Sequence, residues 1–409
     1  MEDQFRAGPD GRTGRVAIAR ARRYDRDEIR AATTKALAFL GGVESIIRPT
    51  DRVFVKTNHL NPPSPAERGI VTHPVFVEGV LSVLRDATSH LVVGDDVDSR
   101  LGDGFQVSGY RAMAERLGVR LVNLREEGFV EVDCRGTILG KVLVSRTALE
   151  ADRIVDLPKL KTHSLTLFTG AVKNLYGAIP AGLRTRFHGE YTKSADFAQV
   201  LVDLFSVLRP CLTLMDGVVA MEGDGPAGGK LRELGILLAS EDAVALDAVA
   251  CRVIGLDPLA VETTRFAAER GLGIGRLERI ELLGEPLDAV AASDFKLPTG
   301  APSRLLSRIP PPIARAIVRQ LSARPVVLLD RCVGCRECER ICPVGAATVS
   351  DGKAHINRPL CVRCMCCHEV CRFSAIQPLR GGLPGWLDRA AGHRGSPQDK
   401  ARGSPRNDP

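Results

Sequence analysis

Nine of the twelve cysteines in this chain of 409 residues lie between positions 332 and 371. The densest stretch is CVRCMCCHEVC, residues 361–371, which holds five cysteines in eleven residues. Because no secretory signal is evident before them, we expect these thiols to stay reduced, and clustered reduced thiols usually bind metal. The other three cysteines stand alone among apolar neighbours and are expected to be core residues: Cys134, Cys211 and Cys251.

The cysteine-rich segment is an internal repeat with an offset of 29 residues. Both halves, 332–342 and 361–371, have the spacing CxxCxxCxxxC, and this alignment leaves Cys366 outside the pattern. The spacing suits an iron–sulfur cube, because the CxxCxxC loop directs three thiolates around one cluster while the fourth cysteine begins a helix directed elsewhere. Zinc is the alternative for any CxxC pair, but zinc takes four ligands and does not need eight at this spacing.

Residues 325–380 resemble the bacterial-type ferredoxins that hold two 4Fe–4S clusters, a small α+β domain. In those proteins the fourth cysteine of each motif ligates the other cluster. The resemblance therefore implies one set of ligands for each cluster. The first set is Cys332, Cys335, Cys338 and Cys371, and the second is Cys342, Cys361, Cys364 and Cys367.

Two residues depart from the ferredoxin pattern. Cys366 lies between two ligands and is either a bystander thiol or an alternative ligand. Arg372 stands where the first half has Pro343, and a cation one residue from a ligand either raises the potential of the cluster or simply faces water.

Residues 13 to about 295 alternate short β-branched runs with amphipathic segments. This pattern predicts an α/β fold with a largely parallel sheet flanked by helices. Gly118 and Gly255 indicate helix stops, and Pro74 after Thr72 indicates a helix start. The predicted strands are 52–58, 90–96, 119–124, 153–158, 211–217 and 234–240, and the predicted helices are 74–87, 110–118, 198–209 and 242–255.

The chain is expected to divide into four parts: an α/β substrate or cofactor domain (13–296), an Arg/Pro-rich connector (297–324), a two-cluster ferredoxin domain (325–380) and a mostly disordered tail (381–409). The amphipathic connector either packs across the α/β domain, which we favour, or lies on an anionic membrane. The net charge of +7 is interleaved along the chain and forms no nucleic-acid-binding stripe. With no long apolar run, we expect a cytoplasmic protein.

Polar side chains stand where several predicted strands end. Open α/β folds bind ligands in the crevice at the carboxyl ends of their strands. We therefore predict a substrate-binding role for these side chains, with an ordinary solvated surface as the alternative. They are Lys56 and Asn58 after the first strand, Asp95 after the second and Asp216 after the fifth.

The segment 156–180, DLPKLKTHSLTLFTGAVKNLYGAIP, carries the densest group of reactive side chains outside the cysteines. Lys159, Lys161 and His163 alternate, so they share one face if the chain is extended. We predict a following helix with Thr169, Lys173 and Asn174. Such a group suits a phosphate or carboxylate, or a proton donor beside a carbonyl or an activated double bond, whereas the alternative is a solvated basic loop.

The stretch 216–230, DGVVAMEGDGPAGGK, predicts an irregular glycine-rich loop. Its acidic residue Glu222 is a candidate for substrate binding. The stretch fits neither a Walker loop nor the GxGxxG fingerprint. Its glycines allow the backbone to approach a ligand closely, but an ordinary mobile loop is the equal alternative.

Several of these motifs together resemble the family named domain of unknown function 362. They are KTN at 56, THP at 72, GDD at 94, PKLKTH and AVKNLYG within 156–180, DGVVAMEGDGP at 216 and AVALDAVA at 243. Members often carry a C-terminal two-cluster ferredoxin unit. The resemblance implies functional positions at Lys159, Lys161, His163, Lys173 and Asn174, with Asp216, Glu222 and Asp247 as second-rank candidates.

These features favour an iron–sulfur oxidoreductase. An electron-donor protein such as a ferredoxin or flavodoxin would reduce two 4Fe–4S clusters, which would reduce a small molecule in the α/β domain, with Lys161 or His163 as proton donor. A further organic cofactor is left open. The alternative is an electron-transfer protein whose α/β domain only docks a partner, and it predicts two exposed clusters and no sizeable pocket near them.

Overall fold

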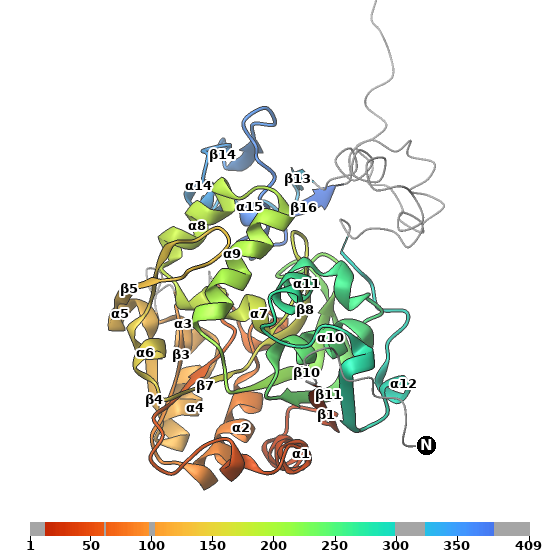
Figure 1. The fold of residues 1–409 in the computed structure, drawn as a ribbon. Helices are drawn as coiled ribbons and strands as arrows, with labels where there is room; N and C mark the ends of the chain where they lie inside the picture. Colours follow the sequence, from red (N-terminus) through yellow and green to blue (C-terminus); the bar gives the residue numbers. More distant parts are fainter. Residues whose placement is uncertain (1–12, 61–62, 98–102, 299–323, 380–409) are drawn as a thin grey trace, which may run out of the picture.

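One mixed sheet forms the centre of the computed structural model, which describes residues 13–60, 63–97, 103–298 and 324–379 (Figure 1). The strand order is β12-β1-β11-β10-β7-β2-β3-β4, and the run from β10 to β4 is parallel throughout. Only β11 is antiparallel to its neighbours along this path. The bounds are β1 (Gly14–Arg20), β2 (Val53–Lys56), β3 (Leu91–Asp95), β4 (Arg120–Asn123), β7 (Arg153–Asp156), β10 (Leu212–Glu222), β11 (Lys230–Ser240) and β12 (Ile280–Gly284).

The largely parallel α/β fold predicted from the sequence is confirmed, and one segment differs from its prediction. Residues 216–230 are not an irregular loop, because β10 continues to Glu222 and β11 begins at Lys230. Nearly every residue of β10 is buried, which explains why its central glycine does not break the strand. Only residues 223–229 form the turn.

Helices cover both faces of the sheet, and the pleat sends neighbouring side chains to opposite layers. Val55 belongs to the cluster beneath α1 and α2, whereas Phe54 belongs to the cluster beneath α9 and α11. The main helices are α1 (Arg26–Phe39), α2 (Pro74–Ala87), α4 (Tyr110–Leu117), α9 (Ser194–Val207), α10 (Ala243–Val253) and α11 (Glu262–Glu269). Shorter helices are α3 (Gly104–Val107), α5 (Leu124–Glu127), α6 (Arg146–Glu150) and α12 (Leu287–Val290).

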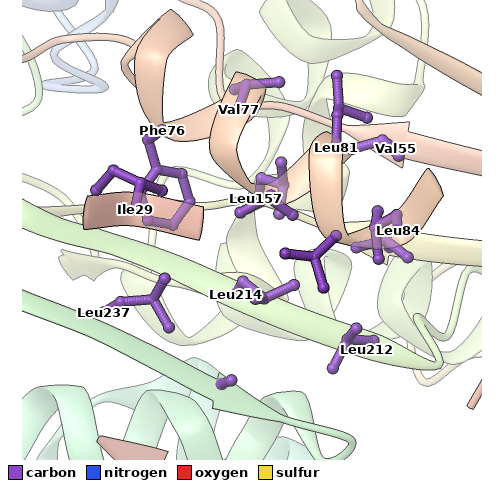
Figure 2. Packing of buried hydrophobic residues seen from close by; sticks show 14 of the residues in the cluster. Ile29, Val55, Phe76, Val77, Leu81, Leu84, Leu157, Leu212, Leu214 and Leu237 are labelled. Carbon is purple, nitrogen blue, oxygen red and sulfur yellow. The ribbon is translucent and has the colours of Figure 1, made fainter. Parts of the chain in front are cut away.

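Helix α2 shows how local sequence and packing agree. Pro74 occupies the first turn and His73 is the N-cap, with its side chain accepting a hydrogen bond from the Val75 amide. Figure 2 shows the buried face of the helix against Leu157, which follows β7, and against strand residues, which are Val55, Leu212, Leu214 and Leu237. Farther along, the predicted stop at Gly118 is confirmed, because this residue is the left-handed C-cap of α4.

A second layer of short elements lies over the carboxyl ends of the parallel strands. Strand β8 (Lys159–His163) pairs with β10 and, as a hairpin, with β9 (Leu167–Thr169). Thr169 therefore ends a strand and is not part of a helix as predicted; the helix begins two residues later. It is α7 (Ala171–Asn174), which is followed by η3 (Leu175–Ala178) and α8 (Ala181–Glu190). A separate hairpin joins β5 (Phe129–Asp133) to β6 (Lys141–Ser145).

The C-terminal unit consists of two antiparallel strand pairs and two short helices. Its backbone repeats with the same offset as its cysteines. Positive φ occurs at Arg336 and again at Met365, 29 residues later, with φ 63° in both, and at Gly334 and again at Arg363. The elements are β13 (Arg324–Val327), α14 (Glu337–Ile341), β14 (Ala347–Ser350), β15 (Lys353–Ile356), α15 (Cys366–Glu369) and β16 (Ile376–Leu379).

The C-terminal unit packs directly on the α/β domain, next to α8 (Figure 1). Two glycines permit the approach. A Cβ at Gly189 of α8 would lie 2.8 Å from Pro343, and one at Gly228 in the β10–β11 turn would lie 2.8 Å from the ring of His368. His368 Nε2 also contacts the carbonyl oxygen of Asp224 at 3.0 Å, so the two units share polar and close van der Waals contacts.

Most of the predicted connector and the predicted tail lie outside the described residues, and with them the membrane-surface interpretation of the connector. Within the described part of the chain, every helix is too short or too polar to cross a membrane.

Candidate functional site

Two cavities in the C-terminal unit are each lined by the four cysteines of one predicted ligand set, and the second is also lined by Cys366. One is lined by Cys332, Cys335, Cys338 and Cys371, and the other by Cys342, Cys361, Cys364 and Cys367. The fourth cysteine of each motif therefore lies with the three cysteines of the other motif. Among the described residues, no group of three His, Cys, Asp or Glu side chains is placed to hold a single metal ion.

Backbone amides point at cysteine sulfurs in both halves of the repeat. The amide of Ala346 donates to Cys342 Sγ at 3.1 Å, and that of Ala375 donates to Cys371 Sγ at 3.2 Å. Such donors stabilise bound thiolates and influence the potential of a cluster. Burial, followed by the neighbouring thiols, raises the pKa of Cys338 to about 11, so an iron–sulfur cluster would supply the positive charge that keeps these thiolates ionised.

A third cavity, here called the interdomain pocket, lies between the α/β domain and the C-terminal unit. It encloses about 140 Å³. One wall comes from β2, β3, α7 and α8, and the other comes from α14 and α15 and the residue that follows α15. The polar and ionisable lining residues include Lys56, Asn58, Asp95, Lys173, Asn174, Arg184, His188, Cys366 and Glu369.

Lys173 is the ammonium group of this pocket that lacks an ion pair. Its Nζ lies 6.0 Å from the ring centroid of Tyr176, and no carboxylate of the described residues lies within 4.0 Å. Lys56 differs, because its Nζ is bound to Asp95 Oδ2 at 2.8 Å. Burial lowers the pKa of Lys173, an effect partly offset by Glu369, so this side chain releases a proton more readily than a surface lysine does.

His163 and Glu369 join the two walls of the site. His163 Nε2 lies 3.1 Å from Glu369 Oε1. His163 Nδ1 accepts hydrogen bonds from the amides of Leu165 and Thr166, which assigns the ring proton to Nε2. Burial lowers the pKa of His163 to about 4. Burial alone would raise the pKa of Glu369, but the neighbouring His163, His188 and Lys173 hold it well below its usual value.

Lys161 does not line the pocket but is hydrogen-bonded to Asn58, which does. Its Nζ donates to Asn58 Oδ1 at 2.7 Å and to the Ile70 carbonyl oxygen at 2.5 Å. Asn58 in turn donates to Asn174, whose amide group donates to Asp156. Burial, followed by Lys173 and Lys159, lowers the pKa of Lys161 to about 7.

Lys159 belongs to a second group around Asp216, in which Lys159 and Asp216 are fully buried and Tyr24 and His73 are partly buried. Its Nζ lies 2.8 Å from Asp216 Oδ2 and 2.5 Å from the hydroxyl of Tyr24. The ring of Tyr24 stacks on His73 with centroids 3.7 Å apart, and the His73 amide donates to the same carboxylate. All hydrogen-bonding capacity of Asp216 is used within the protein, which indicates a positioning role for this group.

The structure thus divides the predicted site residues into two sets. Lys56, Asn58, Asp95, Lys173 and Asn174 line the interdomain pocket. The others do not line it: Lys159, Lys161, His163, Asp216 and Glu222. The three predicted catalytic residues do share one face of an extended strand, but that strand lies between β9 and β10 and beneath the C-terminal unit.

Two second-rank candidates support the backbone. Asp247 accepts hydrogen bonds from the amides of Ala171 and Val172 at the start of α7, and Glu222 accepts one from the Lys296 amide. Asp247 therefore fixes the helix that carries Lys173. Its pKa is raised to about 7, chiefly by burial, and the two amide bonds partly offset this shift.

Residues 53–252 match the family model described as Domain of unknown function (DUF362), and residues 325–348 match the one described as 4Fe-4S binding domain. The thylakoid-associated protein sll1697 of Synechocystis sp. is 32% identical over 285 residues, which cover 69% of this chain and 87% of that protein. The chain belongs to the DUF362 family. The 4Fe-4S match covers the first cysteine motif and supports at least one iron–sulfur cluster.

Two further proteins resemble parts of this DUF362 chain. One component of an ion-translocating oxidoreductase complex of Methanosarcina acetivorans is 39% identical over 46 residues, 11% of this chain and 17% of that component. The lactate racemase apoprotein from Thermoanaerobacterium thermosaccharolyticum superposes with a TM-score of 0.41 and 11% identity, covering 61% of this chain and 59% of the racemase.

Sequence reasoning missed several pocket residues of this DUF362 protein, among them the ionisable Glu369, His188 and Arg184. A signal for Glu369 was present in the repeat, because the position 29 residues earlier is Arg340. The charge therefore reverses between two otherwise equivalent halves, and the half with the carboxylate is the one that faces the α/β domain. No comparable signal marks His188, whose Nδ1 is buried without a hydrogen-bond partner among the described residues.

Proposed function

We propose that this DUF362 protein is an iron–sulfur reductase that holds two 4Fe–4S clusters and reduces a small molecule in the interdomain pocket. The observation that carries the proposal is the composition of the pocket wall. Cys366 and Glu369 belong to α15, the helix that also holds the predicted ligand Cys367, and they face Lys173 across the pocket. A molecule bound there would contact the α/β domain and the cluster-bearing helix at once.

The cysteine cavities support two clusters. Each is lined by four thiols in the crossed arrangement of two-cluster ferredoxins. If each cavity held one cluster, each cluster would supply one electron. Together these are the two electrons that saturate an activated double bond. The same reaction consumes two protons, and these must come from the protein or from water.

Lys173 is the group we assign to bind the substrate and to protonate it. It faces the pocket, lacks an ion pair and has a lowered pKa. His163 and Glu369 would then hold the opposite wall in place, and Glu369 would accept a hydrogen bond from the substrate. This assignment replaces the direct proton donation by Lys161 or His163 that the sequence predicts, because neither residue lines the pocket.

The alternative, an electron-transfer protein without its own substrate, requires two exposed clusters. Among the twelve cysteines, all of which the structure describes, only Cys335 is exposed. The cysteines of the second cavity are buried or half-buried beside the interdomain pocket. This asymmetry favours the reductase.

The test begins with anaerobic reconstitution and analysis of iron, sulfide and zinc. We expect about eight irons per chain. The dithionite-reduced protein, freed of excess reductant, is then mixed with representative unsaturated carbonyl and carboxylate compounds while cluster absorbance is followed. Reoxidation with formation of a reduced product supports the proposal. Four irons after full reconstitution would refute two clusters, and a lack of reoxidation by every class of compound would leave the electron-transfer alternative.

A further inference from the structure

The two cysteine cavities differ in their access to solvent. The first contains Cys335, the exposed cysteine, whereas the second adjoins the interdomain pocket. If electrons leave toward a substrate from the second cavity, they must enter at the first. The surface around Cys335 is therefore the place to look for the electron donor.

An apolar centre surrounds Cys335. Val333 is 58% exposed and Phe373 is 41% exposed, and both line the first cavity. They come from different halves of the repeat, so the fold brings them to one place. Exposed apolar side chains at the centre of a patch are typical of an interface core, which is apolar and is surrounded by a polar rim.

The rim of this patch is basic. Arg336 lines the same cavity, Arg340 donates to the Cys335 carbonyl oxygen at 3.2 Å, and Arg372 precedes Phe373. Two carboxylates oppose these three cations. Glu337 is buried and lies 3.1 Å from Arg340 and 4.0 Å from Arg372, and Glu339 is paired with Arg336 at 3.4 Å, so these five groups leave one net positive charge.

Together, Val333, Cys335, Arg336, Arg340, Arg372 and Phe373 form what we call the first-cluster face. We propose that the first-cluster face is the docking site of an acidic electron-transfer protein. The inference rests on the proposed function in assuming that the first cavity holds a cluster. In each encounter the donor would lose one electron and the first cluster would gain it, so two encounters would supply the two electrons of one reduction. Charge complementarity would steer the encounter, and a small apolar centre over an exposed ligand suits a short-lived complex.

The test measures the second-order rate of cluster reduction by a reduced acidic flavodoxin, in a stopped-flow instrument and without any substrate. We expect Arg336→Glu and Arg340→Glu each to lower the rate at low ionic strength by roughly tenfold or more, and the difference to shrink at high salt. Arg120→Glu is the matched control. The side chain of Arg120 is 62% exposed and is paired with a glutamate that is 32% exposed. The pair of Arg336 with Glu339 is almost the same, with exposed fractions of 62% and 31%.

Three further measurements keep the result interpretable. Iron content and the rate of reduction by dithionite should be unchanged in all variants, which excludes a lost cluster as the cause. Binding of oxidised flavodoxin, measured by calorimetry, should weaken in the same variants. Equal rates for the parent and both variants, or binding to anionic lipid vesicles with no response to flavodoxin, would overturn the proposal.

The outcome separates this inference from the proposed function, because cluster reduction is read without a substrate. Fast, salt-sensitive reduction followed by no turnover with any compound would support the docking face and refute the reductase. Substrate turnover driven by dithionite, with no effect of either arginine variant on reduction by flavodoxin, would support the reductase and refute the docking face.

Discussion

His163 Nε2 lies 3.1 Å from Glu369 Oε1, and this contact joins strand β8 of the α/β domain to helix α15 of the C-terminal unit. Neither atom has a hydrogen-bond partner among the described residues, so the contact is a short polar approach and not a hydrogen bond of good geometry. The imidazole is neutral and carries its proton on Nε2, while the carboxylate is ionised, because the pKa of each group is lowered. One contact therefore couples the predicted catalytic strand to the helix beside the second cysteine cavity.

We expect Glu369→Ala to destabilise the packing of the two units. The substitution removes the buried carboxylate that lies 3.1 Å from the Nε2–H of His163, and loss of this charged contact should cost about 1–3 kcal/mol. Thermal unfolding and the rate of limited proteolysis measure the effect. The control is Glu190→Ala, which removes a partner of Arg186 at 3.3 Å from a pair that is 59% and 49% exposed and should cost at most about 1 kcal/mol. Strictly additive effects of His163→Ala and Glu369→Ala in a double-mutant cycle would contradict this coupling.

We expect Lys173→Met to impair the proposed reductase activity without changing the iron content. Methionine keeps most of the apolar chain beside Tyr176 but removes the ammonium that faces the interdomain pocket. Loss of a hydrogen bond to a charged group corresponds to about 1.5–3 kcal/mol, so kcat/KM should fall by roughly ten- to hundredfold. Lys141→Met, on an exposed hairpin, is the control. An unchanged kcat/KM, measured once a substrate is in hand, would remove Lys173 from its assigned role.

Cys366→Ser should retain the full complement of iron. Cys366 lines the second cavity but falls outside the repeat, and the same cavity already holds four cysteines in register. Cys364→Ser, in contrast, should lose about half of the iron, because it removes a ligand of one cluster. Iron analysis after anaerobic reconstitution decides between the two roles of Cys366. A loss of half of the iron in Cys366→Ser would make it a ligand.

The buried ring of His188 predicts a definite dependence of stability on pH. Its centroid lies 4.4 Å from that of Phe197, and burial lowers its pKa to about 4 from an ordinary value near 6.5. Between these two values the unfolded chain binds more protons than the folded one, so the free energy of unfolding rises as the pH rises from about 4 to 6.5. His188→Phe should therefore reduce the slope of the unfolding free energy against pH, by the amount that corresponds to about one bound proton.

Denaturant unfolding at several pH values between 4.5 and 6.5 measures the slope for the parent and the variant. Tyr176→Phe is the matched control, because it changes another aromatic residue of the same pocket without removing an imidazole. The control should change the free energy of unfolding by the same amount at every pH and leave the slope against pH unchanged. An identical slope in His188→Phe would show that this histidine is not held neutral by burial.

The cysteine arrangement could be predicted because its spacing is specific. Spacing within each CxxCxxC loop places three thiols together, and the resemblance to two-cluster ferredoxins implies that the fourth comes from the other half. The left-handed backbone at Met365 and Arg363 could not be predicted in this way, because the equivalent residues of the first half are Arg336 and Gly334 and only the glycine signals positive φ.

The α/β site could be predicted only in part. Alternation along 159–163 correctly indicates an extended strand with three polar side chains on one face. It does not reveal what covers that face, because Asp216 and Glu369 approach from β10 and from the C-terminal unit. The interdomain pocket itself depends on how the two units pack, and neither periodicity nor composition carries that information.

Cys366 lines both the second cysteine cavity and the interdomain pocket, so at this point the partition between them is a single side chain thick. If the cavities hold clusters as proposed, electron tunnelling across so thin a barrier would require no moving element and no intermediate carrier. We therefore expect the passage of electrons into the pocket to be faster than the proton transfer or product release that follows. A solvent deuterium isotope effect on turnover, together with rapid equilibration between the two clusters, would be the kinetic signature of this arrangement.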